Sequence, residues 1–132
     1  MGNENNYELM TLIMDVLSDK NTHHINELIR KLILMKNISA EEREKLIQTG
    51  NDKLIIRSFD QKVQIALTHL LVFDLIKADQ RWSFNIDYST SYCLAEKGIK
   101  FMDDNKSKSK FEIIGLFKKE MKQISESLIR KQ

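Results

Sequence analysis

Side chains that can contact DNA bases and phosphates are concentrated between residues 57 and 68 of this 132-residue chain. Glutamine amides pair with adenine edges, Arg and Lys with guanine or phosphate, hydroxyl groups with phosphate, and an aliphatic side chain with the thymine methyl. The candidates are Arg57, Ser58, Gln61, Lys62, Gln64, Ile65 and Thr68. Three cations nearby extend this set: Lys53, Lys77 and Arg81. The same residue types also make an ordinary solvated helix face, and composition alone favours that interpretation.

Catalytic or metal-binding residues form no comparable cluster in the sequence. His23 and His24 are adjacent, so their side chains point in different directions, and no third ligand follows at a suitable spacing. Cys93 is the only cysteine and has no obvious base nearby, which is typical of a small buried residue rather than a nucleophile. We therefore expect neither an enzyme nor a cofactor or metal site.

The composition is that of one small folded domain rich in helix. Hydrophobic residues make up 42% of the chain, which is sufficient for a core, while proline is absent and only four glycines occur. This shortage of loop residues favours helices. No apolar run approaches the ~20 residues that cross a bilayer, and the first residues lack the features of a signal peptide. A single cysteine allows no internal disulfide, so we expect a cytoplasmic protein without a membrane segment.

Apolar residues at intervals of three and four predict the helices that would position these side chains. The ranges 7–17 and 25–35 are each typical of an amphipathic helix. The clearest pattern covers 58–72, where the apolar stripe leaves the candidate DNA-contacting residues on the opposite, outward face. We expect this helix to be the recognition element of any nucleic-acid interface.

A capping box predicts one further short helix between these. Ser39 is followed three residues later by Glu42, a spacing in which both side chains satisfy backbone N–H groups of the first helical turn. We expect this helix to run through Ile47 and to stop at Gly50.

Two short segments with strand character follow the helix predicted over 58–72. Residues 75–78 and 92–94 are β-compatible, and the polar segment 79–91 between them allows the two to pair as a hairpin. Helices followed by a hairpin, with the longest polar-faced helix just before it, are the order of a winged helix-turn-helix domain. We therefore predict a mainly α (α+β) fold, a winged helix-turn-helix with a two-stranded wing and an additional C-terminal helix.

The segment 105–132 differs from the rest of the chain in its charge. It holds eight Lys or Arg against three Asp or Glu, whereas residues 1–104 hold 13 against 16. A polar linker opens this segment, so we place a domain boundary there. Residues 1–104 are the predicted winged-helix DNA-binding domain, and residues 105–132 are the predicted linker and C-terminal dimerisation helix.

The helix predicted over 111–130 carries an apolar seam of heptad-like spacing. The seam consists of Ile114, Phe117, Met121, Ile124 and Leu128. One such helix is not stable alone, so the seam either pairs with a second copy in a two-fold dimer or folds back on the first helix of its own chain. Because the seam begins after a charged linker, we favour the homodimer.

Several short motifs occur in a consistent order between residues 7 and 102. They include Tyr7-Glu8-Leu9-Met10, His24-Ile25-Asn26-Glu27-Leu28, Ser39-Ala40-Glu41-Glu42-Arg43, Gln61-Lys62-Val63-Gln64-Ile65-Ala66 and Leu94-Ala95-Glu96-Lys97-Gly98. In this order and spacing they resemble the N-terminal domain of Mrr-type restriction proteins. The resemblance implies a winged helix that binds DNA and is normally followed by a nuclease domain. Family members usually carry a glycine where Asp74 stands.

A nuclease needs several carboxylates and a lysine mounted on a sheet, and residues 105–132 cannot supply that scaffold. We therefore predict the recognition module without the nuclease: a sequence-specific double-stranded-DNA-binding protein, acting as a small dimeric transcriptional regulator. The alternative is a non-catalytic protein-interaction module of a restriction or mobile-element system, which would bind a protein partner through Ile65, Val72 and the aromatic hairpin. The slightly acidic charge of residues 1–104 favours this alternative, because DNA-binding domains are commonly basic.

Overall fold

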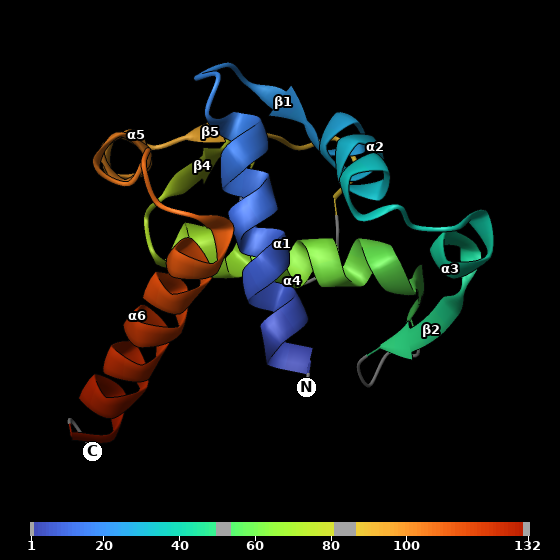
Figure 1. Cartoon of the computed structure of the whole chain (residues 1–132). Helices are drawn as coiled ribbons and strands as arrows, with labels where there is room; N and C mark the ends of the chain where they lie inside the picture. Colours follow the sequence, from blue (N-terminus) through green and yellow to red (C-terminus); the bar gives the residue numbers. More distant parts are fainter. Residues whose placement is uncertain (1, 50–53, 81–86, 131–132) are drawn as a thin grey trace.

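The computed structural model describes residues 2–49, 54–80 and 87–130. Six helices and five strands occur in this part of the chain (Figure 1). In chain order they are α1 (Gly2–Leu17), β1 (His23–His24), α2 (Ile25–Lys36), α3 (Ala40–Glu44), β2 (Leu46–Thr49), β3 (Leu54–Arg57), α4 (Ser58–Val72), β4 (Ile76–Ala78), β5 (Ser91–Leu94), α5 (Glu96–Asp104) and α6 (Lys110–Arg130). The predictions of α1, α2 and α4 are confirmed, with α1 already starting at Gly2. None of the described helices is long and apolar enough to span a membrane.

The wing predicted after the helix at residues 58–72 is present. β4 and β5 pair antiparallel, with Ile76 opposite Leu94. β1 adds to the other edge of β5, with His23 opposite Tyr92, so the sheet has the order β1-β5-β4. This arrangement of helices and one small antiparallel sheet confirms the α+β winged-helix fold.

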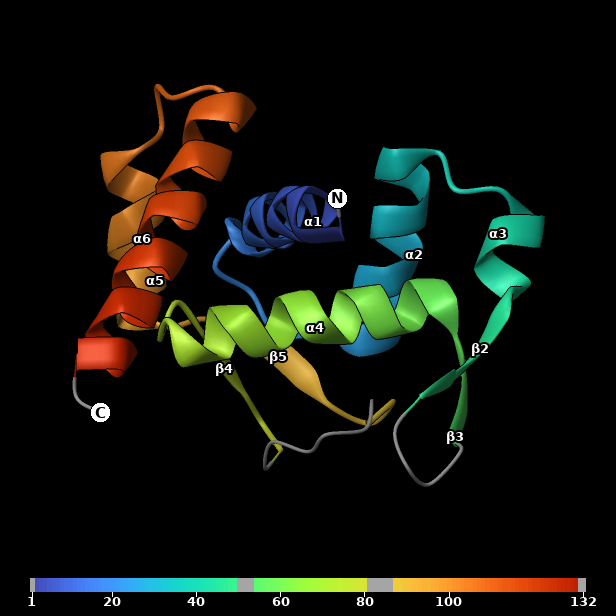
Figure 2. The same cartoon turned by 90° about the horizontal axis from the view of Figure 1, so that it is seen from below.

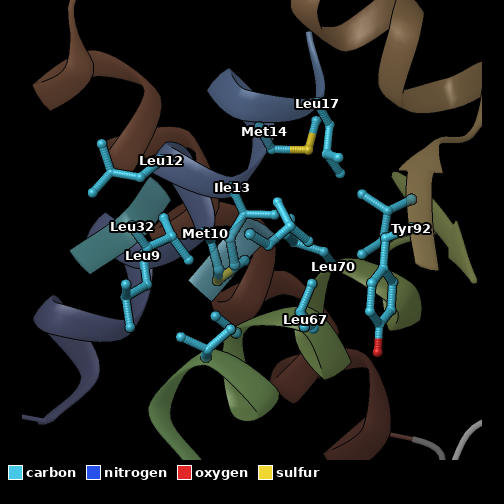
Figure 3. Close-up of a cluster of buried hydrophobic side chains, with 14 of the residues drawn as sticks. Leu9, Met10, Leu12, Ile13, Met14, Leu17, Leu32, Leu67, Leu70 and Tyr92 are labelled. Carbon is cyan, nitrogen blue, oxygen red and sulfur yellow. The ribbon is translucent and has the colours of Figure 1, made fainter. Parts of the chain in front are cut away.

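The core forms where α1 crosses α4 and α2. Figure 2 shows α1 between α2 and α6, with α4 running across it. Figure 3 shows side chains of α1, α2 and α4 meeting there, among them Met10, Ile13, Leu32, Leu67 and Leu70. All five are fully buried, and burying a side chain of this size stabilises the fold by about 1.5–3 kcal/mol. The amphipathic spacing seen in the sequence is therefore what holds α4 in place.

Capping groups fix both ends of α2. At the start, the backbone N–H of Asn26 donates to Nδ1 of His24, at 3.1 Å. At the end, Asn37 adopts a left-handed conformation with φ of 55°, and its N–H bonds back to the last turn. Asn tolerates this conformation better than most residues, so the chain leaves the helix there.

The region between α2 and α4 departs from the sequence prediction. Helix α3 begins as predicted, with Oγ of Ser39 accepting the N–H of Glu42 at 3.1 Å, but it ends at Glu44 instead of running through Ile47. The following residues pair antiparallel as the hairpin β2–β3, with Ile47 opposite Ile56. The physical reason is that α3 buries no side chain, whereas β-branched residues favour extended structure and cross-strand contact.

The first half of α6 is held against the rest of the chain. Phe117 is 1% exposed, and its ring stacks on those of Phe73 and Phe101 at centroid distances of 6.4 and 5.4 Å. Nζ of Lys110 lies 3.0 Å from Oε1 of Glu8 on α1. Phe117 is therefore committed to a contact within the chain, which corrects its predicted place in a dimer seam.

The rest of the predicted seam has a different status. Ile114 is half-buried beside Phe117. The helix then continues away from the other elements to Arg130 (Figure 1). The side chains of Met121, Ile124 and Leu128 lie outside the described part of the structure, so their pairing with a second copy stays a prediction.

Candidate nucleic-acid interface

The hairpin β2–β3 fixes the start of α4. β3 runs directly into the helix, and Arg57 occupies the capping position with an extended backbone. The N–H of Ser58 donates to the carbonyl oxygen of Lys45, which precedes β2, at 2.8 Å. One of the N–H groups that a helix leaves unpaired at its start is thus satisfied by the hairpin.

Burial of α4 extends beyond the apolar stripe expected from the sequence. Val63, Leu67 and Leu70 are fully buried, and so are the polar residues Asp60 and Gln64, at 0% and 8% exposure. The reason is that α4 contacts α3 as well as α1, so two of its sides are covered. This corrects the prediction for Gln64, whose amide does not lie on the outward face.

The remaining candidate residues do share one outward face. Lys62 is exposed, Ile65 is 42% exposed, and Ser58, Gln61 and Thr68 are half-buried. Their spacing of three or four places them on adjacent turns of the helix. The Thr68 hydroxyl donates to a backbone carbonyl one turn earlier, at 2.8 Å, so its proton is already used. Base contacts would therefore come from the centre of this face.

The other predicted cations differ in their surroundings. Nε of Arg57 lies 3.4 Å from Oε2 of Glu44, and this hydrogen-bonded carboxylate raises the pKa of the guanidinium. The ion pair offsets part of the charge that Arg57 could offer to a phosphate. Lys77 is exposed on β4. Lys53 and Arg81 lie outside the described residues.

Exposed charges on and beside α4 are of both signs. They include the cations Lys45, Lys62, Lys77 and Lys97 and the carboxylates Glu41, Glu42, Glu44, Asp74 and Asp79. The fields of exposed charges of opposite sign on one surface offset each other, and salt screens what is left. Any attraction of this surface for an anionic partner must therefore come from local contacts instead of a broad positive field.

A polar cluster around the buried Asp60 lies at the first turn of α4. Nε of Arg43, on α3, is 3.4 Å from Oδ1 of Asp60, and the hydroxyl of Tyr88, just before β5, donates to Oδ2. Burial, together with the hydrogen bond to this carboxylate, raises the pKa of Tyr88 to about 12, so the phenol keeps its proton. Sequence reasoning missed this cluster. The sequence signal was a single acidic residue, Asp60, which lies between Phe59 and Val63 in the apolar stripe.

Residues 7–90, more than half of the chain, match the family described as the Mrr N-terminal domain. The chain belongs to the Mrr N-terminal domain family. This domain is related to restriction systems. No match was found among curated proteins or among solved structures. The resemblance inferred from the short motifs is thereby confirmed.

The Mrr N-terminal domain match covers α1 through the segment that precedes β5. The hairpin β2–β3, the outward face of α4 and all three members of the Asp60 cluster lie inside it. The last strand of the wing, α5 and α6 follow it. The candidate interface therefore belongs to the Mrr N-terminal domain itself.

Asp74 occupies a position where the resemblance leads us to expect glycine. Its φ is 64°, in the left-handed region that an L side chain rarely adopts. Glycine takes this conformation without a steric penalty, and Asp is among the better-tolerated replacements. The left-handed backbone between α4 and β4 gives a physical reason for the glycine that the resemblance leads us to expect.

His23, in the wing sheet of this Mrr N-terminal domain, is hydrogen-bonded to two carboxylates. Its Nε2 lies 2.8 Å from Oδ2 of Asp19, and its Nδ1 lies 2.9 Å from Oε1 of Glu27. Desolvation is the largest single effect on the pKa of His23 and lowers it. The hydrogen bonds and charges of Asp19 and Glu27 together outweigh desolvation, so the pKa is raised above 6.5. Below this raised pKa the ring is an imidazolium, and each ring nitrogen then donates to one carboxylate.

We expect the free energy of unfolding to decrease as the pH rises above 6.5 and passes the raised pKa of His23, and to decrease less in His23→Gln. A raised folded-state pKa contributes stability below the ordinary histidine pKa, and this contribution is lost as the pH passes the folded-state value. Urea unfolding of both proteins at several pH values measures the difference. Parallel curves for the two proteins would contradict the assignment.

Proposed function

We propose that this chain is a sequence-specific double-stranded-DNA-binding protein whose helix α4 enters the major groove. The observation that supports this proposal is the outward face of α4, where Gln61, Lys62 and Ile65 project from a helix that the core holds on its other sides. In winged and other helix-turn-helix domains, a helix held in this way reads base edges. The chain would act by occupying its site, without catalysing a reaction.

Each side chain on this face has a distinct role in the proposal. The amide of Gln61 would pair with an adenine edge, and Ile65 would contact a thymine methyl. Lys62 and, from β4, Lys77 would contact phosphates. Phosphate contacts set the orientation of the protein, whereas the two base contacts provide the sequence preference.

Dimerisation would supply affinity that a surface of mixed charge lacks. We propose that Met121, Ile124 and Leu128, in the half of α6 beyond Phe117, pair with the same residues of a second copy. A two-fold dimer places two recognition helices in successive major grooves, and the basic segment 105–132 adds positive charge. Such a dimer on an operator would regulate transcription by occupancy.

Gln61→Ala and Lys62→Ala are expected to affect DNA binding differently. Gln61→Ala should weaken binding to a duplex selected from a random pool by about 1–3 kcal/mol and leave random duplexes nearly unaffected. Lys62→Ala should weaken both duplexes alike and reduce the slope of log affinity against log salt by about one. Titration of labelled duplexes at several salt concentrations measures both effects.

Lys100→Ala, which removes an exposed lysine from α5, is the matched control and should bind like the wild type. Footprinting of the selected duplex should show two half-sites about 10 base pairs apart if the protein is a dimer. Equal affinity of the wild type for selected and random duplexes would refute sequence-specific binding. A single protected half-site would refute the dimer.

A protein-interaction module is the second candidate function, and exposed apolar side chains favour it. Val72 is 66% exposed on α4, and Leu46 and Ile55 are 61% and 62% exposed on the hairpin β2–β3. Their removal from water would favour association with a protein. Purification from a native lysate after nuclease treatment tests this candidate, because a stoichiometric protein partner that survives DNA removal would support it.

A further inference from the structure

Two hairpins lie next to α4, one near each of its ends, as Figure 2 shows. β2–β3 lies at the N-terminal end of α4, and β4–β5 lies toward its C-terminal end. A duplex placed against the outward face of α4 would therefore also approach both hairpins. The distance of each hairpin from α4 then affects how many contacts the duplex can make.

The carboxylate of Asp60 connects both hairpins to α4. Arg43 belongs to α3, which leads into β2, and Tyr88 belongs to the segment that leads into β5. Each contacts a different oxygen of the same carboxylate. Because α3 buries no side chain, polar contacts such as this ion pair contribute much of its attachment to α4.

A buried carboxylate is costly to desolvate, so its presence at this position needs a physical reason. Three groups compensate the charge of Asp60: the Arg43 guanidinium, the Tyr88 hydroxyl and the N-terminal end of the α4 dipole, since Asp60 lies in the first turn. Burying an apolar side chain would cost less desolvation free energy, but hydrophobic contacts have no preferred direction. The hydrogen bond from Tyr88 fixes the direction of its contact with Asp60, and the ion pair holds Arg43 at 3.4 Å without a hydrogen bond between Nε and Oδ1.

We propose that Asp60 is a positioning residue for DNA binding, which holds the two hairpins at set distances from the outward face of α4 through Arg43 and Tyr88. The inference rests on the proposed function. Residues that do not touch DNA would then determine the affinity of the protein for DNA. Lys77, on β4, is the described cation whose phosphate contact depends on this position.

Tyr88→Phe is the first test, since it removes a single hydroxyl from a residue that is 39% exposed. Affinity for the selected duplex should fall about fivefold, and the slope of log affinity against log salt should decrease by about one as the Lys77 contact is lost. The preference for selected over random duplexes should not change. Tyr7→Phe, on half-buried Tyr7 of α1, is the matched control and should alter neither quantity. A loss of stability alone would reduce the amount of active protein without changing the salt slope.

Amide hydrogen exchange tests the attachment without DNA. Asp60→Asn keeps the shape of the side chain and an acceptor for Tyr88, but it removes the charge that attracts Arg43. Exchange in β2 and β3 should therefore become about threefold faster or more in this variant. Tyr88→Phe should instead accelerate exchange in β4 and β5, and Tyr7→Phe should leave all four strands unchanged.

The outcomes separate this inference from the proposed function. Unchanged exchange in both variants would overturn the role of Asp60, whatever the DNA measurements show. Binding by the wild type with unchanged affinity and salt slope in Tyr88→Phe would overturn the positioning role alone. A wild type that binds no duplex would overturn the proposed function, while accelerated exchange would still support attachment of both hairpins through Asp60.

Discussion

Phe117→Ala is expected to lower the free energy of unfolding by about 3–5 kcal/mol, the usual cost of removing a buried aromatic ring. The ring is 1% exposed and lies between Phe73 and Phe101, so its removal leaves a cavity and breaks two aromatic contacts. These contacts join α6 to the end of α4 and to α5. Urea unfolding followed by circular dichroism measures the change.

The matched control for this prediction lies on the same helix. Phe111 is 84% exposed, so Phe111→Ala should change the free energy of unfolding by no more than about 0.5 kcal/mol. The comparison also distinguishes the two arrangements of α6. If Phe117 served a dimer seam, the destabilisation would depend on protein concentration, and a concentration-dependent result would contradict the intrachain contact.

Gly98→Ala is expected to lower the free energy of unfolding by about 3 kcal/mol through a steric clash. A Cβ atom at this position would lie 1.9 Å from the carbonyl oxygen and 2.9 Å from the carbonyl carbon of Leu75. Both atoms belong to the backbone next to β4 and cannot rotate away. The N–H of Ala95 donates to the same carbonyl at 3.0 Å, so a shift of α5 that relieved the clash would also strain this bond.

Gly115→Ala provides the control for the glycine substitution. Gly115 lies inside α6, and a Cβ there would meet nothing within 4 Å. This variant should gain about 0.5–1 kcal/mol, because alanine has less conformational freedom to lose in a helix. Unfolding curves for both variants under the same conditions provide the test. Equal effects at the two positions would refute the close approach at Gly98.

The helical part of the fold could be predicted because its signal is local. Apolar residues three and four positions apart predicted a helix over 58–72, and the structure has α4 at Ser58–Val72. The strand segments after it were predicted from residue type, and β4 and β5 pair as expected. The outward positions of Gln61, Lys62 and Ile65 followed from the same helical periodicity.

The hairpin β2–β3 could not be predicted in the same way. The capping box at Ser39 and Glu42 indicates where a helix begins but carries no information on where it ends. Ile47 fits either a helix or a strand by its type, and its pairing with Ile56 is a contact between two separate segments of the chain. Such pairings depend on the partner strand, which a local pattern does not contain.

By itself, the sequence determined the family, the main helices, the wing and the face of α4 that points outward, because periodicity and residue type record which side of each element is apolar. Only the tertiary structure decided that Gln64 is covered, that Asp60 joins Arg43 and Tyr88, and that Phe117 packs against its own chain. Each of these outcomes depends on a neighbour distant in sequence. Burial by a second element is a property of the assembled fold, and the spacing of residues along one helix cannot specify it.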